Sequence, residues 1–265
     1  MESDLNGKVA VVTGASRGLG RNVAAALAFH GAAVALVARG ETELRETNRI
    51  ITTAGGQASC YPIDVQVPAH VERLKAEVEG AFGPPSILVN AAGVFGPMRT
   101  IRDSAPERWI ETLLINTAGP YLLSHAFVGG MIDAGWGRIV NVSSAASLSP
   151  PGPLNSAYGA SKAALNHLTR HLAAEIAGSG VTANVIHPGE LKTEMWEDIR
   201  DQVGALSPHE EAYSGWVRLV EQTGGDPPEK AVALVLSLMT EQASAVNGRF
   251  LWIEDGIQRP IPSWP

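Results

Sequence analysis

The strongest constraint on the fold is a regular alternation of short apolar runs with longer segments of helical apolar spacing. The apolar runs are rich in Val, Ile and Ala and occupy residues 9–12, 33–37, 87–89, 139–142, 181–186 and 250–253. The segments with helical spacing include residues 19–29, 69–82, 157–177 and 228–239. Near-continuous apolar runs are typical of strands buried on both faces, and helices between them imply parallel pairing. The alternation predicts an α/β fold: a doubly wound, Rossmann-type parallel sheet of about seven strands with helices on both faces.

No long Pro-, Gly- or Ser-rich tract divides the chain, so we expect one domain over residues 1–265. A less regular excursion is expected within it at residues 190–226. In an open parallel sheet, ligands bind beyond the carboxyl ends of the strands. Functional residues are therefore expected just after the apolar runs.

The composition argues against several kinds of partner. The formal net charge is −7 and the chain has no cluster of Lys and Arg, which disfavours sequence-independent binding of nucleic acid. The longest apolar runs are shorter than a membrane span, and residues 1–6 have acidic residues but no apolar signal core. The single cysteine, Cys60, cannot form an intramolecular disulfide. We therefore expect a soluble, cytoplasmic protein without nucleic-acid or membrane partners.

A glycine-rich turn follows the first apolar run and leads directly into helical spacing. Its residues are Thr13, Gly14, Ala15, Ser16, Arg17, Gly18, Leu19 and Gly20. Glycines allow a positive φ and a close approach of the backbone to a pyrophosphate, while a helix N-terminus offers unpaired amides and a positive dipole end. The turn is a candidate dinucleotide site, and the alternative is a tight turn that binds nothing.

The end of the second apolar run bears on the choice of cofactor. An acid about 20 residues after the glycine turn would bind the ribose 2′-hydroxyl of NAD, but Arg39 stands at the tip of this run instead. Arg39 and Arg17 are placed to bracket the 2′-phosphate of NADP through charge-assisted contacts. The alternative is two solvated surface arginines. We favour NADP(H) over NAD(H).

The next two runs also end in candidate cofactor contacts. A further short apolar run, at residues 61–63, is the third along the chain. Asp64 and Val65 follow it at the height of an adenine edge, although Asp64 could instead cap a helix that starts near Pro68. The fourth run ends in Asn90, Ala91, Ala92 and Gly93. Small residues there allow a cofactor to cross the sheet edge, and the amide of Asn90 can tie neighbouring strands together.

Tyr158 and Lys162 are four residues apart in a segment with helical spacing, so they share one helix face about a turn apart. A phenol with a reference pKa of about 10 is a poor base at neutral pH, and a neighbouring ammonium lowers that pKa. Ser144 follows the fifth run, where its hydroxyl can hold a substrate oxygen. Alone, such a pair is usually a surface pair. The other motifs, in order along the chain, favour a functional site.

Taken together, these motifs resemble the short-chain dehydrogenase/reductase family, in its compact single-domain type. The matching residues follow the family order over nearly the whole chain and are Thr13, Gly14, Gly18, Gly20, Asp64, Val65, Asn90, Ala91, Ala92, Gly93, Asn116, Ser144, Tyr158, Lys162, Pro188, Gly189 and Thr193. The resemblance implies an oxidoreductase that transfers a hydride between a nicotinamide and a carbonyl or secondary alcohol, without a metal.

The resemblance also implies a role for each of four residues. Tyr158 is the general acid in carbonyl reduction and the base in alcohol oxidation, and Ser144 binds the substrate oxygen. Lys162 lowers the pKa of Tyr158 and binds the nicotinamide ribose. Asn116 holds a water that links Lys162 to solvent, or alternatively kinks a buried helix. The nicotinamide is positioned by Pro188, Gly189, Leu191 and Thr193.

The choice of serine is ambiguous. The family usually has one residue fewer between its serine and tyrosine than the thirteen that separate Ser144 from Tyr158. Ser143 is one residue further away. We choose Ser144 and expect a one-residue insertion at residues 150–153.

In this family, the region equivalent to residues 190–226 covers the substrate. Here it contains Met195, Trp196, Tyr213 and Trp216, and Phe95 with Met98 would line the facing wall. These side chains suit a bulky apolar ketone or alcohol, and equally suit the packing of a lid. Within the same region, Glu190 is either a solvated charge or a substrate contact. His187, just before it, is expected to be structural.

The favoured function is an NADP(H)-dependent ketoreductase or alcohol dehydrogenase. An alternative is a non-catalytic nicotinamide-binding sensor or scaffold, although such a protein need not keep the whole relay. The compact glycine spacing disfavours a dehydratase or epimerase. Because the family commonly forms tetramers or dimers through its long helices, we expect a homo-oligomer, with a homotetramer favoured. The Pro-rich tail with Trp264 packs on a neighbouring subunit or simply ends the chain.

Overall fold

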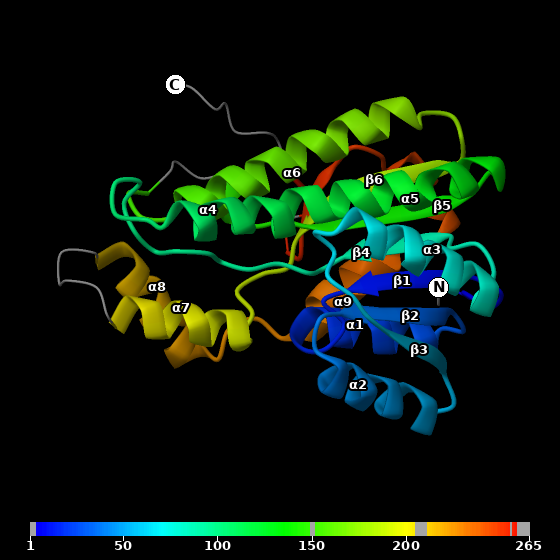
Figure 1. Cartoon of the computed structure of the whole chain (residues 1–265), viewed down its shortest axis with the longest axis horizontal. Helices are drawn as coiled ribbons and strands as arrows, with labels where there is room; N and C mark the ends of the chain where they lie inside the picture. The colour runs from blue at the N-terminus through cyan, green and yellow to red at the C-terminus, as the bar shows by residue number, and fades with distance from the viewer. Residues whose placement is uncertain (1–3, 149–151, 205–210, 255, 259–265) are drawn as a thin grey trace.

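The structure, a computed structural model, describes residues 4–148, 152–204, 211–254 and 256–258. Its centre is one sheet with the strand order β3-β2-β1-β4-β5-β6-β7-β8 (Figure 1). The strands are β1 (Val9–Thr13), β2 (Ala33–Ala38), β3 (Gln57–Pro62), β4 (Ile87–Asn90), β5 (Gly137–Val142), β6 (Val181–His187), β7 (Phe250–Trp252) and β8 (Gly256–Gln258). The first seven pair in parallel, which confirms the predicted doubly wound parallel sheet. The short β8 adds an antiparallel edge that was not expected.

Helices cover both faces of the sheet. One face carries α1 (Gly18–Phe29), α2 (Glu41–Thr53) and α9 (Pro228–Ser237), and the other carries α3 (Pro68–Phe82), α5 (Gly119–Asp133) and α6 (Ser156–Glu175). Alternate residues of β1 belong to different cores, Ala10 and Val12 to the first and Val9 and Val11 to the second. Because central strands such as β1 and β4 are buried on both faces, their sequences are almost wholly apolar rather than alternating, whereas the edge strand β3 is partly exposed and has a mixed sequence.

A long helical run on the second face changes its hydrogen-bonding pattern midway. It consists of α4 (Pro106–Leu113), the π-helical turn η1 (Leu114–Ala118) and α5, and it packs along α6. Two short 3₁₀ turns, η2 (Ala145–Ser147) and η3 (Glu241–Ala245), lie elsewhere in the chain. No helix in the described part of the chain is long and apolar enough to cross a membrane.

Two further helices lie beyond the carboxyl ends of the strands, at the left of Figure 1. They are α7 (Glu194–Gly204) and α8 (Glu211–Thr223), and their apolar residues form a third core with Phe95 and Tyr158. The expectation of a less regular excursion at residues 190–226 was therefore wrong for most of this segment. The Pro-rich tail, with Pro260 and Trp264, and part of the expected insertion at residues 150–153 lie outside the described residues.

Candidate functional site

A cleft of about 1300 Å³ opens at the carboxyl ends of the strands. Its walls come from the segments that follow β1, β2, β3, β4, β5 and β6, together with α6, α7 and α8. The volume exceeds the roughly 300–1,000 Å³ of an ordinary ligand pocket, so the cleft has room for a dinucleotide and a second molecule. It is lined by Ser144 and by every predicted cofactor contact except Asn90. Asn90 and Asn116 are instead buried behind the wall.

The glycine-rich turn between β1 and α1 is shaped for a close-approaching ligand. Gly14 and Gly18 have φ of +65° and +52°, and a Cβ on Gly14 would lie 2.9 Å from the backbone of Ala91. A Cβ on Gly20 would collide with the carbonyl oxygen of Gly14. The N-cap residue of α1, Arg17, makes no side-chain capping bond. Open amides at a helix N-terminus fit a pyrophosphate.

Two residues that the sequence did not single out fix this turn from behind. The guanidinium of Arg21 donates hydrogen bonds to the carbonyl of Ser16 and to Thr47 Oγ1, the latter at 3.0 Å. The buried Thr47 hydroxyl in turn donates to the carbonyl of Ala15 at 2.9 Å. Thr47 lies on α2, far along the chain, and no local pattern links it to the turn. These bonds hold the turn in place without entering the cleft.

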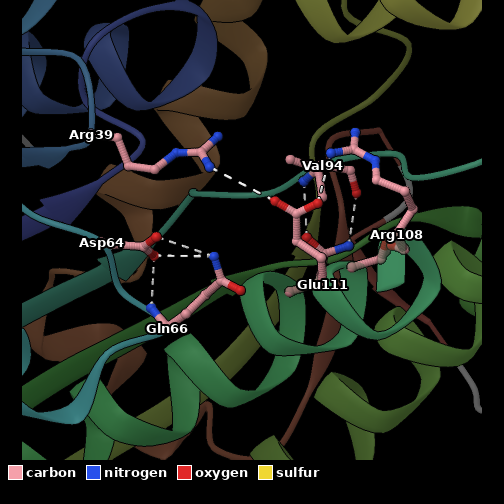
Figure 2. A network of polar contacts seen from close by, with 8 residues as sticks. Arg39, Asp64, Gln66, Val94, Arg108 and Glu111 are labelled. Carbon is pink, nitrogen blue, oxygen red and sulfur yellow. Dashed lines mark hydrogen bonds and ion pairs between the residues drawn. The ribbon is translucent and has the colours of Figure 1, made fainter. Parts of the chain in front are cut away.

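The expected adenine end of the cleft carries a polar network (Figure 2). Glu111 of α4 lies between two arginines, with its Oε1 4.0 Å from Arg39 Nη1 and its Oε2 2.7 Å from Arg108 Nη1. The Arg39 side chain is 61% exposed and lines the cleft. An exposed ion pair at this distance contributes little, so the Arg39 guanidinium is available to an anion.

Asp64 lies in the same region (Figure 2). Its Oδ1 accepts a hydrogen bond of 3.0 Å from the backbone of Gln66, and the Gln66 amide also donates to it. The N-cap of α3 is Val67, which makes no side-chain capping bond. The alternative role of Asp64 as a helix cap is therefore wrong, and its carboxylate lines the cleft.

Tyr158 and Lys162 lie one turn apart on α6 and face the cleft. Burial raises the pKa of Tyr158 to about 12, although contact with the Ser144 hydroxyl acts in the opposite direction. Burial also lowers the pKa of Lys162 to about 8. Lys162 Nζ donates a 2.8 Å hydrogen bond to the carbonyl of Val142 and lies 5.6 Å from the centre of the Tyr158 ring. Burial therefore dominates the pKa of both groups, and the lowering of the Tyr158 pKa by Lys162 stays a prediction.

Asn116 sits in the π-helical turn η1 and is fully buried. Its Oδ1 accepts from the Val94 N–H at 2.9 Å, while its Nδ2 donates to the Val94 carbonyl at 2.9 Å and to Ser161 Oγ at 3.0 Å. A Cβ on Gly93 would lie 3.3 Å from Asn116 Oδ1 and 3.5 Å from Lys162 Nζ. The helix irregularity that was the alternative role of Asn116 is present, and Gly93 lies beside both the Asn116 amide and the Lys162 ammonium.

Hydrogen bonds between side chains lock the strand ends beneath the site. Asn90 Nδ2 donates to Asn141 Oδ1 at 2.7 Å, and Asn141 Nδ2 donates to Thr169 Oγ1 at 2.8 Å. The tie between strands that was expected of Asn90 is thus present. Thr13 Oγ1 accepts from the amides of Ala91 and Ala92, both at 3.1 Å. The two hydrogen bonds to Thr13 were not predicted, although Thr13 belongs to the glycine-rich motif.

Aromatic side chains form the wall nearest Tyr158. The ring of Phe95 lies 4.7 Å from that of Tyr158 and 6.4 Å from that of Tyr213. Met195, Trp196, Tyr213 and Trp216 also line the cleft. Met98 differs from expectation: it is fully buried in the third core, not among the cleft-lining residues. The other side chains of this wall therefore both pack against one another and line the cleft, while their fit to a bulky apolar ketone or alcohol stays a prediction.

The fold and this cleft define an oxidoreductase that works with a nicotinamide dinucleotide. Residues 8–204 match the model of the short chain dehydrogenase family. A short chain dehydrogenase of Pseudocercospora fijiensis (strain CIRAD86) is 33% identical over 254 residues, which cover 94% of this chain and 80% of that protein. The chain therefore belongs to the short-chain dehydrogenase/reductase family, whose members act on alcohols or carbonyls with NAD(P).

Solved structures agree with this assignment. A metagenomic short-chain oxidoreductase in complex with NADP superimposes with a TM-score of 0.73 at 32% identity, over 90% of this chain and 93% of that chain. NAD+-bound xylitol dehydrogenase gives a TM-score of 0.85 at 28% identity, over 94% of this chain and 98% of that chain. These similar proteins bind different cofactors, so similarity alone does not choose between NADP and NAD.

Proposed function

We propose that this protein is an NADP(H)-dependent oxidoreductase that interconverts a carbonyl compound and its secondary alcohol. The observation that carries the proposal is the buried Tyr158 hydroxyl beside Ser144 in a dinucleotide-sized cleft, with Lys162 one helical turn further on. The alternative, a non-catalytic sensor of the same fold, does not require these three groups to converge.

The glycine-rich turn fits the pyrophosphate, and Arg17 and Arg39 at the far end of the cleft fit the 2′-phosphate of NADP. Asp64 and Val65 would face the adenine, while Thr193 and its neighbours after β6 would hold the nicotinamide amide. When bound, the nicotinamide supplies or accepts the hydride. Preference for NADP(H) over NAD(H) rests on the two arginines and on the absence of an acid at the tip of β2.

Tyr158 holds the proton of the reaction. With a pKa of about 12, its phenol stays protonated at neutral pH and is suited to donate to the oxygen of a carbonyl being reduced. Ser144 stabilises the charge that develops on that oxygen. Lys162, fixed by the Val142 carbonyl, would contact the ribose, and Asn116 would position Lys162 from behind.

Substitutions can separate the proposed enzyme from a sensor. NADPH oxidation is followed with a panel of ketones, aldehydes and acyl thioesters. Tyr158→Phe should lower turnover by about 10³-fold or more. NADPH binding, measured by fluorescence, should be retained in this variant. Ser144→Ala should lower turnover far more than Ser143→Ala, because the buried Ser143 hydroxyl faces Ser147 Oγ at 3.4 Å. Binding of NADPH without turnover across the panel would favour the sensor.

A further inference from the structure

Glu190 is a carboxylate in the cleft that the proposed chemistry does not use. Its position is fixed by reciprocal bonds to Asp226: the Glu190 N–H donates to Asp226 Oδ2 at 2.9 Å, and the Asp226 N–H donates to the Glu190 carbonyl at 3.0 Å. The segment after β6 is thereby joined to the segment before α9. The backbone that carries Glu190 is held on both sides, so its side chain projects from a defined point.

The side chain itself is held at one oxygen and open at the other. Trp216 of α8 donates a 2.5 Å hydrogen bond from Nε1 to Glu190 Oε2. Oε1 lies 4.0 Å from His187 Nε2 and accepts no hydrogen bond from any described residue. Burial lowers the pKa of His187 to about 4, so this imidazole is neutral at pH 7. The remaining acceptor of Glu190 therefore faces the cleft without a cation beside it.

The environment of this carboxylate perturbs it. The Glu190 side chain keeps 41% of its surface exposed, and the burial of the rest raises its pKa. Glu190 also acts electrostatically on Tyr158, whose pKa it raises, so the two groups share one compartment. Perturbed groups in a cleft are typical of functional positions.

The rest of this end of the cleft has the same sign of charge. Besides Glu190, the acids Glu197, Asp198 and Asp201 line it. Glu194 lies instead near the glycine-rich turn, where its Oε2 would be 3.6 Å from a Cβ on Gly18. Among the described residues from 188 to 216 that line the cleft, none is a lysine or arginine. The arginines that line it, Arg17 and Arg39, lie at the cofactor end, which also carries the acids Glu43 and Asp64. An end of a cleft that is lined by acids and by no lysine or arginine attracts cations and hydrogen-bond donors and repels anions.

We propose that Glu190 is a specificity-determining residue: its open oxygen binds a second hydroxyl or an amino group on the carbonyl substrate, and the acidic end of the cleft excludes substrates that carry a carboxylate or phosphate. This inference rests on the proposed function for turnover, but the charge preference of the site can be measured without turnover.

The test uses four ketones on one skeleton with NADPH: cyclohexanone, 4-hydroxycyclohexanone, 4-aminocyclohexanone and 4-oxocyclohexanecarboxylate. We expect kcat/KM for the amino and hydroxy ketones to exceed that of cyclohexanone by about 10-fold, and that of the carboxylate to fall below it. Glu190→Gln should reduce the amino-to-parent ratio by about 10-fold while leaving part of the hydroxyl preference, because a neutral amide still accepts a hydrogen bond. Equal kcat/KM values across the four ketones would overturn the proposal.

Glu197→Gln is the matched control, since it removes an acid from the same cleft but not the one held by Trp216. Its amino-to-parent ratio should stay within about threefold of the unsubstituted protein; an equal fall in both variants would show a diffuse field rather than a specific contact. Calorimetric titration of the NADPH-loaded protein with cyclohexylamine and with cyclohexanecarboxylate gives a readout without chemistry. The protein could reduce none of the ketones and still bind the amine more tightly than the carboxylate, with this preference lost in Glu190→Gln. That result would reject the proposed function but support Glu190 as a specificity-determining residue. No preference for the amine would reject the specificity.

Discussion

At the scale of single residues, Arg39 carries most of the proposed cofactor preference. Its guanidinium forms only a long, exposed ion pair with Glu111, at 4.0 Å, so binding a phosphate would cost little of the existing interaction. Arg39→Ala should therefore weaken NADPH binding by about 10- to 100-fold, the range of one or two charge-assisted contacts. NADH binding, which involves no 2′-phosphate, should change by less than about threefold.

Fluorescence titration with both nucleotides measures this effect. Arg73→Ala, which removes an exposed arginine from α3 outside the cleft, is the control and should leave both affinities unchanged. Equal weakening of NADPH and NADH by Arg39→Ala would contradict the assignment of Arg39 to the 2′-phosphate.

His187 makes a second prediction, which concerns pH. Burial lowers its pKa from 6.5 to about 4, and nearby Asp226 only partly opposes this shift. Between pH 6.5 and 4 the unfolded chain therefore binds more protons at this residue than the folded chain does, so the free energy of unfolding falls as pH falls. The loss should reach about 3 kcal/mol near pH 4, at 1.36 kcal/mol per pKa unit.

Urea unfolding of the unsubstituted protein and of His187→Gln, from pH 7 to pH 4.5, isolates this contribution. The carboxylates around His187, Glu190 and Asp226, titrate in both proteins and cancel in the comparison. The variant should lose less stability over this range. Parallel curves would show that His187 is not buried in its neutral form.

The sequence predicted single residues well where the chemistry is local and poorly where the environment decides. The turn from Gly14 to Gly20 and the Tyr158–Lys162 spacing are visible in a few adjacent letters, and all of these residues except the buried Ala15 line one cleft. The upward shift of the Tyr158 pKa was not visible in the sequence, because it comes from burial, and that burial depends on packing with α7, α8 and Phe95. Thr47 was missed because its partners, Ala15 and Arg21, are brought to it only by packing.

At the scale of elements, the π-helical turn η1 joins the long helical run to the strand β4. Asn116 makes three hydrogen bonds from this turn, two of them to the backbone of Val94. Asn116→Ala leaves buried donors and acceptors unpaired, so the free energy of unfolding should fall by about 2–4 kcal/mol. Turnover should fall as well, because the wall beside Lys162 loses its support.

Denaturant unfolding with a matched substitution checks this prediction. Asn48→Ala on α2 removes an amide whose Oδ1 has no hydrogen-bond partner among the described residues, and it should change stability by less than about 0.5 kcal/mol. A loss below about 1 kcal/mol for Asn116→Ala would mean that water replaces the amide in η1.

The helices α7 and α8 show the limit of sequence reasoning at this scale. Trp196, Ile199 and Val203 recur at helical spacing and pack in the third core, so a signal for α7 was present. The segment is short and amphipathic, and acidic residues surround its apolar positions. In the sequence alone such a segment resembles a loop, because a short helix of this kind is stable only when another part of the chain covers its apolar face. That face is covered by Phe95 and Tyr158, which come from distant parts of the chain.

At the scale of the whole molecule, the sheet was predictable because burial on both faces makes its central strands, such as β1 and β4, almost wholly apolar. The order of the strands was not, since nothing local states that β4 pairs with β1 rather than with β3. That order places the ends of β1, β4 and β5 together, and with them the glycine turn and the loop that carries Ser144. The strand order therefore determines that these residues form one site, although each of them could be recognised separately in the sequence.

The expected homo-oligomer leads to a prediction about the surface of the long helical run. Ile110, Leu114, Tyr121 and Ile132 are exposed by 53%, 41%, 51% and 41%. They are spaced close to whole numbers of helical turns, so they form one apolar stripe along α4, η1 and α5. An exposed stripe of this kind is typical of a surface that another chain covers.

Light scattering should therefore give a mass that is a multiple of 27.9 kDa, and Tyr121→Glu should shift the assembly toward monomers, because a buried interface penalises an unpaired charge. Phe29→Glu on α1 is the control, since Phe29 is 81% exposed yet lies outside the stripe. A monomeric unsubstituted protein would contradict the oligomer, and dissociation by Phe29→Glu but not by Tyr121→Glu would place the interface on α1. Because α4 and η1 pack against α6, which carries Tyr158, a partner on this stripe would hold the helix of the proposed catalytic tyrosine from its outer side. Dissociation should then lower turnover without changing the proposed cofactor contacts of Arg17 and Arg39.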